Sequence, residues 1–388
     1  MKSNLRHLRA FLAVVEFGSV TRAAELCFVS QPAVTQAINK LELLAGTALF
    51  QRTAQGLFPT EAGGVLAGRV KRAFDLLDPA LAELAPRLRV TATHAQLIAL
   101  IAMREAENFT LAARRLGLAQ PTVHRAVTQL EQEAARPLFE RTSYGMVATR
   151  PAQALAQAAR LAFAELDQAE ADLGEVSGRE VGRIVVGAMP LSRSYILPRT
   201  IARFRKGRPT LPVKALDGPY DDLIAGLRRG EIDFLVGALR NPPPIGDVEQ
   251  QPLFDDELVI VARHDHPLVG RTVISLPDLA GYPWVVAMSG TPTRNQFDLM
   301  FAPLGGGPRS LVETGSMILM RELLKESDHL GFISRLQIEA DLRPGEIVRL
   351  PVGSEGTARP IGLTMRVGWV PTKAQQEFLD ELRSVIAQ

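Results

Sequence analysis

Residues 20–42 read VTRAAELCFVSQPAVTQAINKLE, and residues 109–131 read FTLAARRLGLAQPTVHRAVTQLE. The Ala-Ala, Gln-Pro and Leu-Glu pairs of the first stretch return in the second at a constant spacing of 89 residues. The same spacing relates the whole of residues 5–63 to a second segment, without a gap. A constant offset over that length indicates that one folding unit has been copied whole.

Each copy contains the pattern of a helix-turn-helix. In the first copy Phe28-Val29 ends a short helix that carries the Ala-Ala pair, whose small side chains let another helix approach closely. Ser30 is a favourable N-cap for the next helix, and Pro32 falls in its first turn, where a missing N–H costs little. Two short helices joined by a tight turn, the second of them freshly capped, are typical of DNA-reading domains.

The second of these helices has a polar face that its apolar stripe leaves outside. Amides and hydroxyls on such a face can meet base edges in a major groove. The outward residues are Gln31, Thr35, Gln36, Asn39 and Lys40 in the first copy, and Gln120, Thr122, His124, Arg125, Thr128 and Gln129 in the second. An arginine in the hairpin that follows, Arg52 or Arg141, is well placed for phosphate or a narrow minor groove. The alternative for each helix alone is an ordinary polar surface, and for each arginine a solvated turn. The repetition favours DNA.

Five segments of the first copy closely resemble the N-terminal head of LysR-type transcriptional regulators: residues 23–25, 29–35, 41–42, 49–52 and 60–63. The resemblance implies a winged helix-turn-helix that binds double-stranded DNA. It places the family's base-facing and phosphate-facing positions on Gln31, Pro32, Ala33, Thr35, Gln36 and Arg52. It also implies a cytoplasmic homo-oligomer without a cofactor, with RNA polymerase as a further partner.

The second copy departs from this pattern in two places. Ala119 stands where the first copy has its capping serine, which forfeits about 1 kcal/mol of helix capping. Residues 61–63, Glu-Ala-Gly, become Arg-Pro-Ala at 150–152. We expect the second head to touch DNA; weaker binding, another target sequence and a purely structural role are all left open.

An apolar stripe with alternating steps of four and three residues follows each head, from Leu66 to Leu84 and from Leu155 to Leu173. Such a seam buries itself against another helix. The resemblance implies that this helix pairs two subunits, and the alternative is packing within its own domain. Pro79 predicts that the first of these helices stops or kinks near Asp78. We therefore expect the second to be longer and straighter.

From Gly182 onward short apolar strands alternate with helices, which indicates a parallel α/β sheet. Residues 366–370 are predicted as a late strand before a final helix, Lys373 to Ile386. The region resembles the two-lobed effector-binding domain of the same family, related in shape to periplasmic binding proteins. The fold class is thus α + α/β. The expected domains are a first head at 1–63, a first linker helix at 64–90, a second head at 91–150, a second linker helix at 151–178, and an effector domain at 182–388 whose lobes are 182–255 with 357–388, and 256–356.

A ligand in such a fold sits between the lobes, at strand ends beside helix N-termini. Hydroxyls and free N–H groups there favour carboxylates, so we expect a small-molecule effector, an aromatic or aliphatic organic acid. The alternative for each serine is a plain helix cap. The candidate effector-binding residues are Ser192, Ser194, Arg240, Ser289, Thr291, Gly315 and Ser316.

Composition excludes several other classes of protein. The net charge is +2, and residues 1–90 carry 11 Lys and Arg against 7 Asp and Glu, which suits a polyanionic partner. A single cysteine excludes a disulfide framework within the chain and a cysteine zinc site. No apolar run is long enough for a membrane span. The cluster at residues 264–266, His-Asp-His, is interpreted as a turn and not as a metal site.

We predict a transcriptional regulator and not an enzyme; the alternative is a ligand-binding protein without specific DNA recognition.

Overall fold

The computed structural model describes residues 4–54, 56–143, 145–243, 245–342, 345–352 and 358–387. The chain separates into two compact units. Unit 1 comprises the described residues up to 183, together with 210–212 and 229–231, and unit 2 comprises the remainder. No helix among these described residues is both long enough and apolar enough to cross a membrane.

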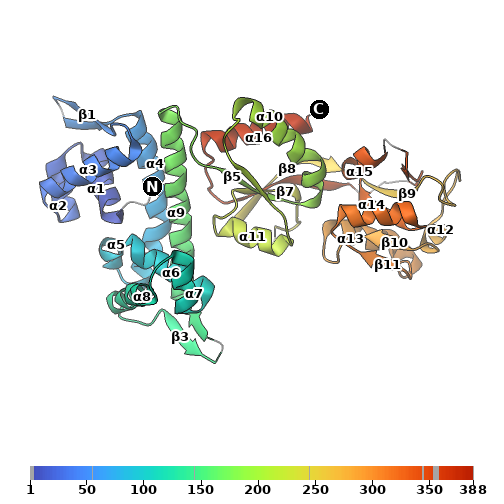
Figure 1. Ribbon diagram of the computed structural model, residues 1–388, viewed down its shortest axis with the longest axis horizontal. Helices are drawn as coiled ribbons and strands as arrows, with labels where there is room; N and C mark the ends of the chain where they lie inside the picture. Colours follow the sequence, from blue (N-terminus) through green and yellow to red (C-terminus); the bar gives the residue numbers. More distant parts are fainter. Residues whose placement is uncertain are drawn as a thin grey trace. The chain divides into compact units, whose positions relative to one another are not determined.

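Unit 1 contains two copies of one winged helical domain (Figure 1). The first head consists of α1 (Leu5–Phe17), α2 (Val20–Cys27), α3 (Gln31–Ala45), β1 (Phe50–Thr53) and β2 (Gly56–Pro59). The second head consists of α6 (His94–Ala106), α7 (Phe109–Leu116), α8 (Gln120–Ala134), β3 (Phe139–Thr142) and β4 (Gly145–Ala148). Each element of the second head begins and ends 89 residues after its counterpart, so the copied sequence folds into a copied structure.

The core of each head is built from the inward stripes of its first and third helices. Leu8, Phe11 and Val14 of α1 are fully buried, as are Val34 and Leu41 of α3. In the second head the same positions hold buried side chains of α6 and α8, namely Leu97, Leu100, Met103, Val123 and Leu130. Because these stripes face the core, the opposite faces of α3 and α8 are left to solvent.

The repeated Leu-Glu pair fixes the wing to the third helix. Glu42 Oε1 accepts the backbone N–H groups of Leu49 (2.8 Å) and Phe50 (3.3 Å). Glu131 accepts the equivalent two N–H groups in the second head at the same distances. A carboxylate that accepts two backbone N–H groups makes charge-assisted bonds. The hairpin strands therefore start at a defined place relative to α3 and α8.

A long helix follows each wing, α4 (Glu61–Leu84) and α9 (Arg150–Val176), and the two lie side by side (Figure 1). They run antiparallel, because Arg69 of α4 meets Asp172 of α9 whereas Arg72, further along α4, meets the earlier Glu165. The short α5 (Leu88–Thr91) then leads into the second head. The two apolar seams are thus buried against each other within one chain. This corresponds to the alternative in which the helix packs within its own domain and not against a second subunit.

The first linker helix was predicted to stop or kink near Asp78, and the first of these two outcomes is wrong, while the kink stays a prediction. The helix continues through Pro79 to Leu84. Pro79 lies on the exposed side, while Leu77 and Leu81 on the other side are fully buried against α9. Tertiary burial therefore offsets the hydrogen bond that proline removes. The second linker helix is the longer one, 27 residues against 24, as predicted.

Unit 2 has two lobes, each built on a five-stranded sheet. The first sheet has the order β6-β5-β7-β14-β8, and the second has the order β11-β10-β12-β9-β13. The strands are β5 (Ile184–Ala188), β6 (Val213–Leu216), β7 (Phe234–Ala238), β8 (Val248–Asp256), β9 (Leu258–Arg263), β10 (Trp284–Val286), β11 (Leu311–Glu313), β12 (Leu330–Ser334), β13 (Ile347–Arg349) and β14 (Arg359–Arg366). Neither sheet is wholly parallel, since β14 pairs antiparallel with β7 and β8, and β9 with β12 and β13.

Helices cover both sheets. The first lobe carries α10 (Leu197–Gly207), α11 (Tyr220–Arg228) and α16 (Lys373–Ile386). The second lobe carries α12 (Leu276–Ala280), α13 (Pro292–Phe301), α14 (Met317–Glu326) and α15 (Arg335–Leu342). A π-helical turn over Ser192–Ile196 joins β5 to α10.

The late strand predicted at residues 366–370 is misplaced. The strand is β14, which ends at Arg366, and the chain then turns. Gly368 has φ +72°, and the Trp369 N–H donates to Arg366 O (3.1 Å). The apolar residues after Arg366 therefore belong to a turn that leads into α16. Residue 357, where we expected the chain to return to the first lobe, lies outside the described residues.

Candidate DNA-binding and effector sites

The polar face of α3 is presented to solvent by the capped start of the helix. Ser30 Oγ accepts the Ala33 N–H (3.4 Å), so α3 begins at Gln31. The exposed residues are Gln31, Pro32, Ala33, Thr35, Gln36, Asn39 and Lys40. Arg52 is exposed on β1 of the same head. All the residues predicted to meet DNA in the first head are therefore accessible on that head.

The second head presents the equivalent face of α8. Gln120, Pro121, Thr122, His124, Arg125 and Gln129 are exposed, Thr128 is half-buried, and Arg141 is exposed on β3. Ala119 provides no side-chain cap. The His124 ring stacks at a tilt on Phe109, with centroids 4.9 Å apart, and its Nδ1 lies 3.5 Å from Thr128 Oγ1. This face is thus also accessible, with different chemistry.

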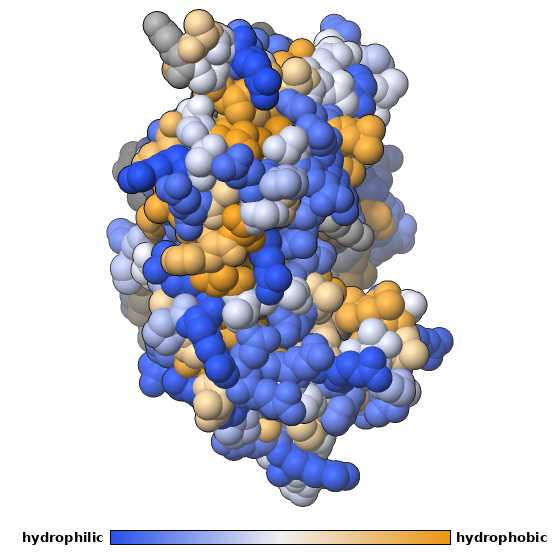
Figure 2. Space-filling model, turned by 90° about the vertical axis from the view of Figure 1, so that its left-hand side faces the viewer, coloured by the Kyte–Doolittle hydropathy of each residue, from blue (hydrophilic) through white to orange (hydrophobic). Residues whose placement is uncertain are grey.

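The surfaces of the two heads differ in polarity away from these faces. Figure 2 looks at the end of unit 1 that carries both heads, and hydrophobic residues gather mainly in its upper half, where the first head lies. Phe28 is 90% exposed and Leu43 is 82% exposed. The equivalent positions in the second head hold Gly117 and Gln132.

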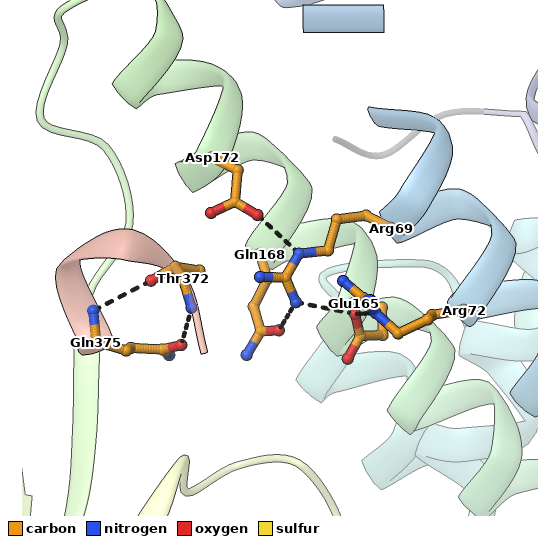
Figure 3. A network of polar contacts seen from close by, with 7 residues as sticks. All are labelled: Arg69, Arg72, Glu165, Gln168, Asp172, Thr372 and Gln375. Atoms are coloured by element: carbon orange, nitrogen blue, oxygen red, sulfur yellow. Dashed lines mark hydrogen bonds and ion pairs between the residues drawn. The ribbon is translucent and has the colours of Figure 1, made fainter. Parts of the chain in front are cut away.

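A buried polar cluster joins the two linker helices (Figure 3). Arg69 of α4, only 2% exposed, donates to Asp172 (2.7 Å), Gln168 (2.6 Å) and Glu165 (3.1 Å) of α9. Arg72 adds a bond to Glu165 (3.2 Å). Burial raises the pKa of Asp172, and the Arg69 guanidinium opposes that rise. The cluster therefore balances two guanidinium groups against two carboxylates inside the helix pair.

An arginine beyond the end of each linker helix caps the third helix of the other head. Arg87, which follows α4, donates to the carbonyls of Glu133 (2.7 Å) and Gln132 (3.0 Å) in α8. Arg179, which follows α9, donates to the Ala45 carbonyl at the end of α3 (3.2 Å). A cation at a helix C-terminus is favourable because the carbonyl dipoles there are unpaired. The end of the third helix of each head is thereby held by the other copy.

Unit 2 contains a cavity of about 1090 Å³ between its lobes. Five of the seven predicted effector residues line it: Arg240, Ser289, Thr291, Gly315 and Ser316. Ser316 caps α14 by accepting the Leu319 N–H (3.3 Å), and Thr291 caps α13 by accepting the Arg294 N–H (3.2 Å). The start of each of these two helices therefore borders the cavity.

Ser192 and Ser194 do not line this cavity. Ser192 Oγ donates to Met189 O (2.7 Å), and Ser194 Oγ lies within bonding distance of Leu191 O (3.3 Å). The π-helical turn after β5 thus folds both hydroxyls back onto carbonyls of the residues just before it. Arg193, which sequence reasoning passed over, lines the cavity instead and pairs with Asp217 (2.7 Å).

Three neighbouring polar groups beside the cavity have buried atoms without a hydrogen-bond partner among the described residues. They are Arg240 Nε, Tyr220 Oη and Gln250 Nε2. Arg240 lies over the Tyr220 ring at 4.4 Å and donates through Nη1 to Gly290 O (2.7 Å), while Gln250 Oε1 accepts the Arg240 backbone N–H (3.0 Å). Burial raises the pKa of Tyr220, so its hydroxyl stays a donor at neutral pH. Unsatisfied buried donors of this kind call for an acceptor.

A second polar group that sequence reasoning missed lies at the junction of the lobes. Arg359 of β14 donates to Asp256 through Nε (3.3 Å) and Nη2 (3.1 Å), and it also bonds Thr293. Ser334 donates to the other Asp256 oxygen (2.8 Å). Burial raises the pKa of Asp256, and Arg359 and Ser334 oppose the rise. Arg359 and Asp256 are 103 residues apart, so no local pattern could have paired them.

The histidine cluster at 264–266 behaves as a turn. His266 Nδ1 accepts the Leu268 N–H (3.1 Å), which leaves the Nε2 proton facing Asp328 O (3.3 Å). Burial lowers the pKa of His266, so the neutral ring that these bonds require is favoured. No group of three potential metal ligands comes together within the described parts of the chain.

Comparisons with known proteins agree with this architecture. The family model described as "Bacterial regulatory helix-turn-helix protein, lysR family" matches twice, over residues 5–64 and 94–153. The model described as "LysR substrate binding domain" matches residues 177–387. The helix-turn-helix model therefore recognises both heads, and the second model covers nearly all of unit 2.

Two relatives match different shares of this chain. The HTH-type transcriptional regulator GalR of Pseudomonas putida is 37% identical over 391 residues, which cover 99% of this chain and 98% of GalR. The uncharacterized HTH-type transcriptional regulator YdcI of Escherichia coli is 32% identical over 276 residues, which cover 70% of this chain and 89% of YdcI. The match to GalR thus spans both heads, whereas the match to YdcI leaves about a third of this chain uncovered.

Solved structures show the same fold at lower identity. A full-length variant of OxyR from Pseudomonas aeruginosa has a TM-score of 0.54 at 22% identity and covers 75% of this chain and 93% of its own. CbnR, a LysR family transcriptional regulator, has a TM-score of 0.50 at 21% identity and covers 75% of this chain and 98% of its own.

A duplicated winged helix-turn-helix joined to a two-lobed ligand-binding domain defines a DNA-binding transcriptional regulator that a small molecule controls. The chain belongs to the LysR family of such regulators. It is a regulator and not an enzyme.

Proposed function

We propose that one chain presents both of its heads to one DNA duplex and reads two half-sites with α3 and α8. The observation that carries this proposal is the burial of α4 against α9 within a single chain. In a protein with one head per chain, two heads are brought together only by a second chain, whereas here the linker seams already join them. DNA contact would use the exposed residues of α3 and α8 together with Arg52 and Arg141.

A salt-dependent gel shift and a footprint on the DNA upstream of the protein's own gene test this proposal. Specific binding should weaken steeply as salt rises, because phosphate contacts release counterions. The first-head variant Gln31→Ala/Thr35→Ala/Arg52→Ala and the second-head variant Gln120→Ala/His124→Ala/Arg141→Ala should each abolish protection of a different half-site. A second head that serves only as structure would instead leave the footprint unchanged in the second variant.

The effector of this proposal is an aromatic or aliphatic organic acid bound in the cavity of unit 2. Support comes from the unsatisfied donors Arg240 Nε and Tyr220 Oη, and from the helix starts at Thr291 and Ser316. A carboxylate supplies acceptors for such donors and is favoured at helix N-termini. Calorimetry should detect binding of carboxylates and not of the corresponding amides. Tyr220→Phe and Arg240→Gln should each weaken binding; equal affinity for acid and amide would contradict the proposal.

Transcriptional control of the chromosome supports a cytoplasmic location and contact with RNA polymerase. We also propose a homo-oligomer. Because the seams of α4 and α9 are buried against each other, chains that associate with both heads intact must use other surfaces.

A further inference from the structure

We infer that the two heads read different base sequences, so that the operator consists of two unlike half-sites, with Gln36 and Arg125 as the main discriminating residues. This inference rests on the proposed function, since it requires both heads to enter DNA. Two heads supplied by identical chains must be identical. Two heads encoded in one chain are free to differ, and here they differ on the face that would meet bases.

The two faces can be compared position by position because α3 and α8 have the same length and the same 89-residue offset. Gln-Pro opens both helices, at 31–32 and at 120–121. The next outward positions are unlike: Ala33, Thr35, Gln36 and Asn39 in α3 correspond to Thr122, His124, Arg125 and Thr128 in α8. All four positions are exposed in α3, and the first three are exposed in α8.

The differences change which base each head can recognise. Glutamine and asparagine form paired hydrogen bonds with adenine N6 and N7, whereas arginine does so with guanine O6 and N7. Gln36 and Asn39 therefore give the first head an adenine-type face. Arg125 gives the second head a guanine-type contact at the position equivalent to Gln36.

The environment of Arg125 leaves it available for such a contact. It is exposed, and no carboxylate among the described residues forms an ion pair with it. Arg115 of the preceding helix, in contrast, is paired with Glu105 (3.7 Å). The neighbouring His124 is held in place by Phe109 and by Thr128, contacts that Thr35 and Asn39 do not reproduce in the first head.

The frame that holds each wing, in contrast, has not diverged. Glu42 and Glu131 hold their wings with identical distances, and the wing glycines have nearly the same backbone angle, φ +136° at Gly56 and +133° at Gly145. The residues of the outward face therefore differ within an unchanged wing frame, as a change of target sequence requires. Loss of DNA binding would remove the constraint on wing and helix equally, so it does not explain the preserved frame.

Selection from a random duplex DNA library with the full-length protein tests the inference. The wild type should enrich a bipartite motif whose halves differ, with adenine opposite one head and guanine opposite the other. Arg125→Gln should change the guanine preference in one half only, by on the order of tenfold. Gln36→Arg should change only the other half. Thermal unfolding of each variant verifies that the heads remain folded.

Exchanging the outward residues of α3 for those of α8 tests the inference more strongly. The quadruple variant Ala33→Thr/Thr35→His/Gln36→Arg/Asn39→Thr places the second head's residues on α3, and it should convert the motif to one with two like halves. A palindromic motif from the wild type would overturn the inference and leave the proposed function standing, as would a wild-type preference that Arg125→Gln leaves unchanged. Enrichment of a single half-site would overturn both the inference and the two-headed reading of the proposed function. Enrichment of no motif at all would overturn the proposed function itself.

Discussion

At the scale of residues, the two heads differ first in how their reading helices begin. Ser30 caps α3 through the Ala33 N–H, and Ala119 gives α8 no such bond. Pro32 and Pro121 both occupy the first turn, so the cap is the main difference at the helix start. The lost cap is a cost of stability, separate from the exposed residues that meet DNA.

Restoring the cap should therefore stabilise the second head without changing its target. Ala119→Ser is expected to raise the free energy of unfolding of unit 1 by about 1 kcal/mol, and Ser30→Ala to lower it by a similar amount. Chemical denaturation followed by circular dichroism measures both. If Ala119→Ser has no effect while Ser30→Ala destabilises, the hydroxyl at residue 119 does not reach the N–H groups of α8, and the helices begin differently.

At the scale of elements, the cluster around Arg69 specifies which helices pair. The 89-residue repeat relates each residue of α4 to one of α9. The positions equivalent to Arg69 and Asp172 hold Ala158 and Glu83. The positions equivalent to Arg72 and Glu165 hold Leu161 and Leu76. Neither ion pair therefore has an ion pair as its counterpart in the other half of the seam. Pairing of α4 with another α4, or of α9 with another α9, would bury these groups without their partners, which is costly. The cluster thus favours α4 with α9 over both alternatives.

Removing Arg69 alone should be strongly destabilising. Arg69→Met leaves Asp172 and Glu165 in the helix pair without their main cation, a loss expected to be about 3–5 kcal/mol. Burial already raises the pKa of Asp172, and Arg69 is the first group that opposes the rise. When a carboxyl group has a raised pKa in the folded state, the protein loses stability as the pH rises through that pKa. The loss of stability of Arg69→Met relative to wild type should therefore be largest at neutral pH and shrink under acidic conditions.

Thermal unfolding across pH measures this difference between variant and wild type. Arg72→Met is the matched control, because Arg72 is half-exposed and bonds only Glu165 within the cluster. A deficit for Arg69→Met that is equal at all pH values would show that lost packing, and not unpaired carboxylates, explains the instability.

The cross-capping arginines predict that each head depends on the other copy. Arg87→Ala frees the end of α8, and Arg179→Ala frees the end of α3. Each is expected to cost roughly 1 kcal/mol of helix-end stability. Footprinting should show Arg87→Ala weakening the second-head half-site and Arg179→Ala the first. The reverse assignment would mean that the caps do not act through the helices they touch.

The helices and strands of the heads could be predicted from the sequence because the signals for the start and end of each element occur in both copies. It could not say what the seam of α4 meets, since an apolar stripe fits any partner and the Arg69 cluster lies off the stripe. In unit 2 the cavity residues at helix starts, Thr291 and Ser316, could be predicted from strand ends. Ser192 could not be excluded, because only the π-helical turn reveals that its hydroxyl faces Met189 O. Arg359 and Asp256 meet only through the pairing of distant strands.

At the scale of the whole molecule, joining two heads through a buried helix pair fixes their separation. The α4 and α9 seams are almost wholly buried, and the polar cluster prevents one helix from sliding along the other without unpairing charges. A flexible linker would instead allow the heads to adjust to different separations on DNA. The proposed two-headed reader should therefore tolerate only one spacing of its half-sites.

Inserting half a helical turn, about 5 base pairs, between the two selected half-sites tests this rigidity because it moves one half-site to the opposite side of the duplex. Two rigidly joined heads can then no longer engage together, and the effective concentration of the second head is lost, a drop on the order of 100-fold in affinity or more. The second-head variant Gln120→Ala/His124→Ala/Arg141→Ala is the control, since it should bind both DNAs equally. Full affinity of the wild type for the lengthened DNA would mean that the heads that share an operator come from different chains, or that unit 1 opens between α4 and α9 on DNA.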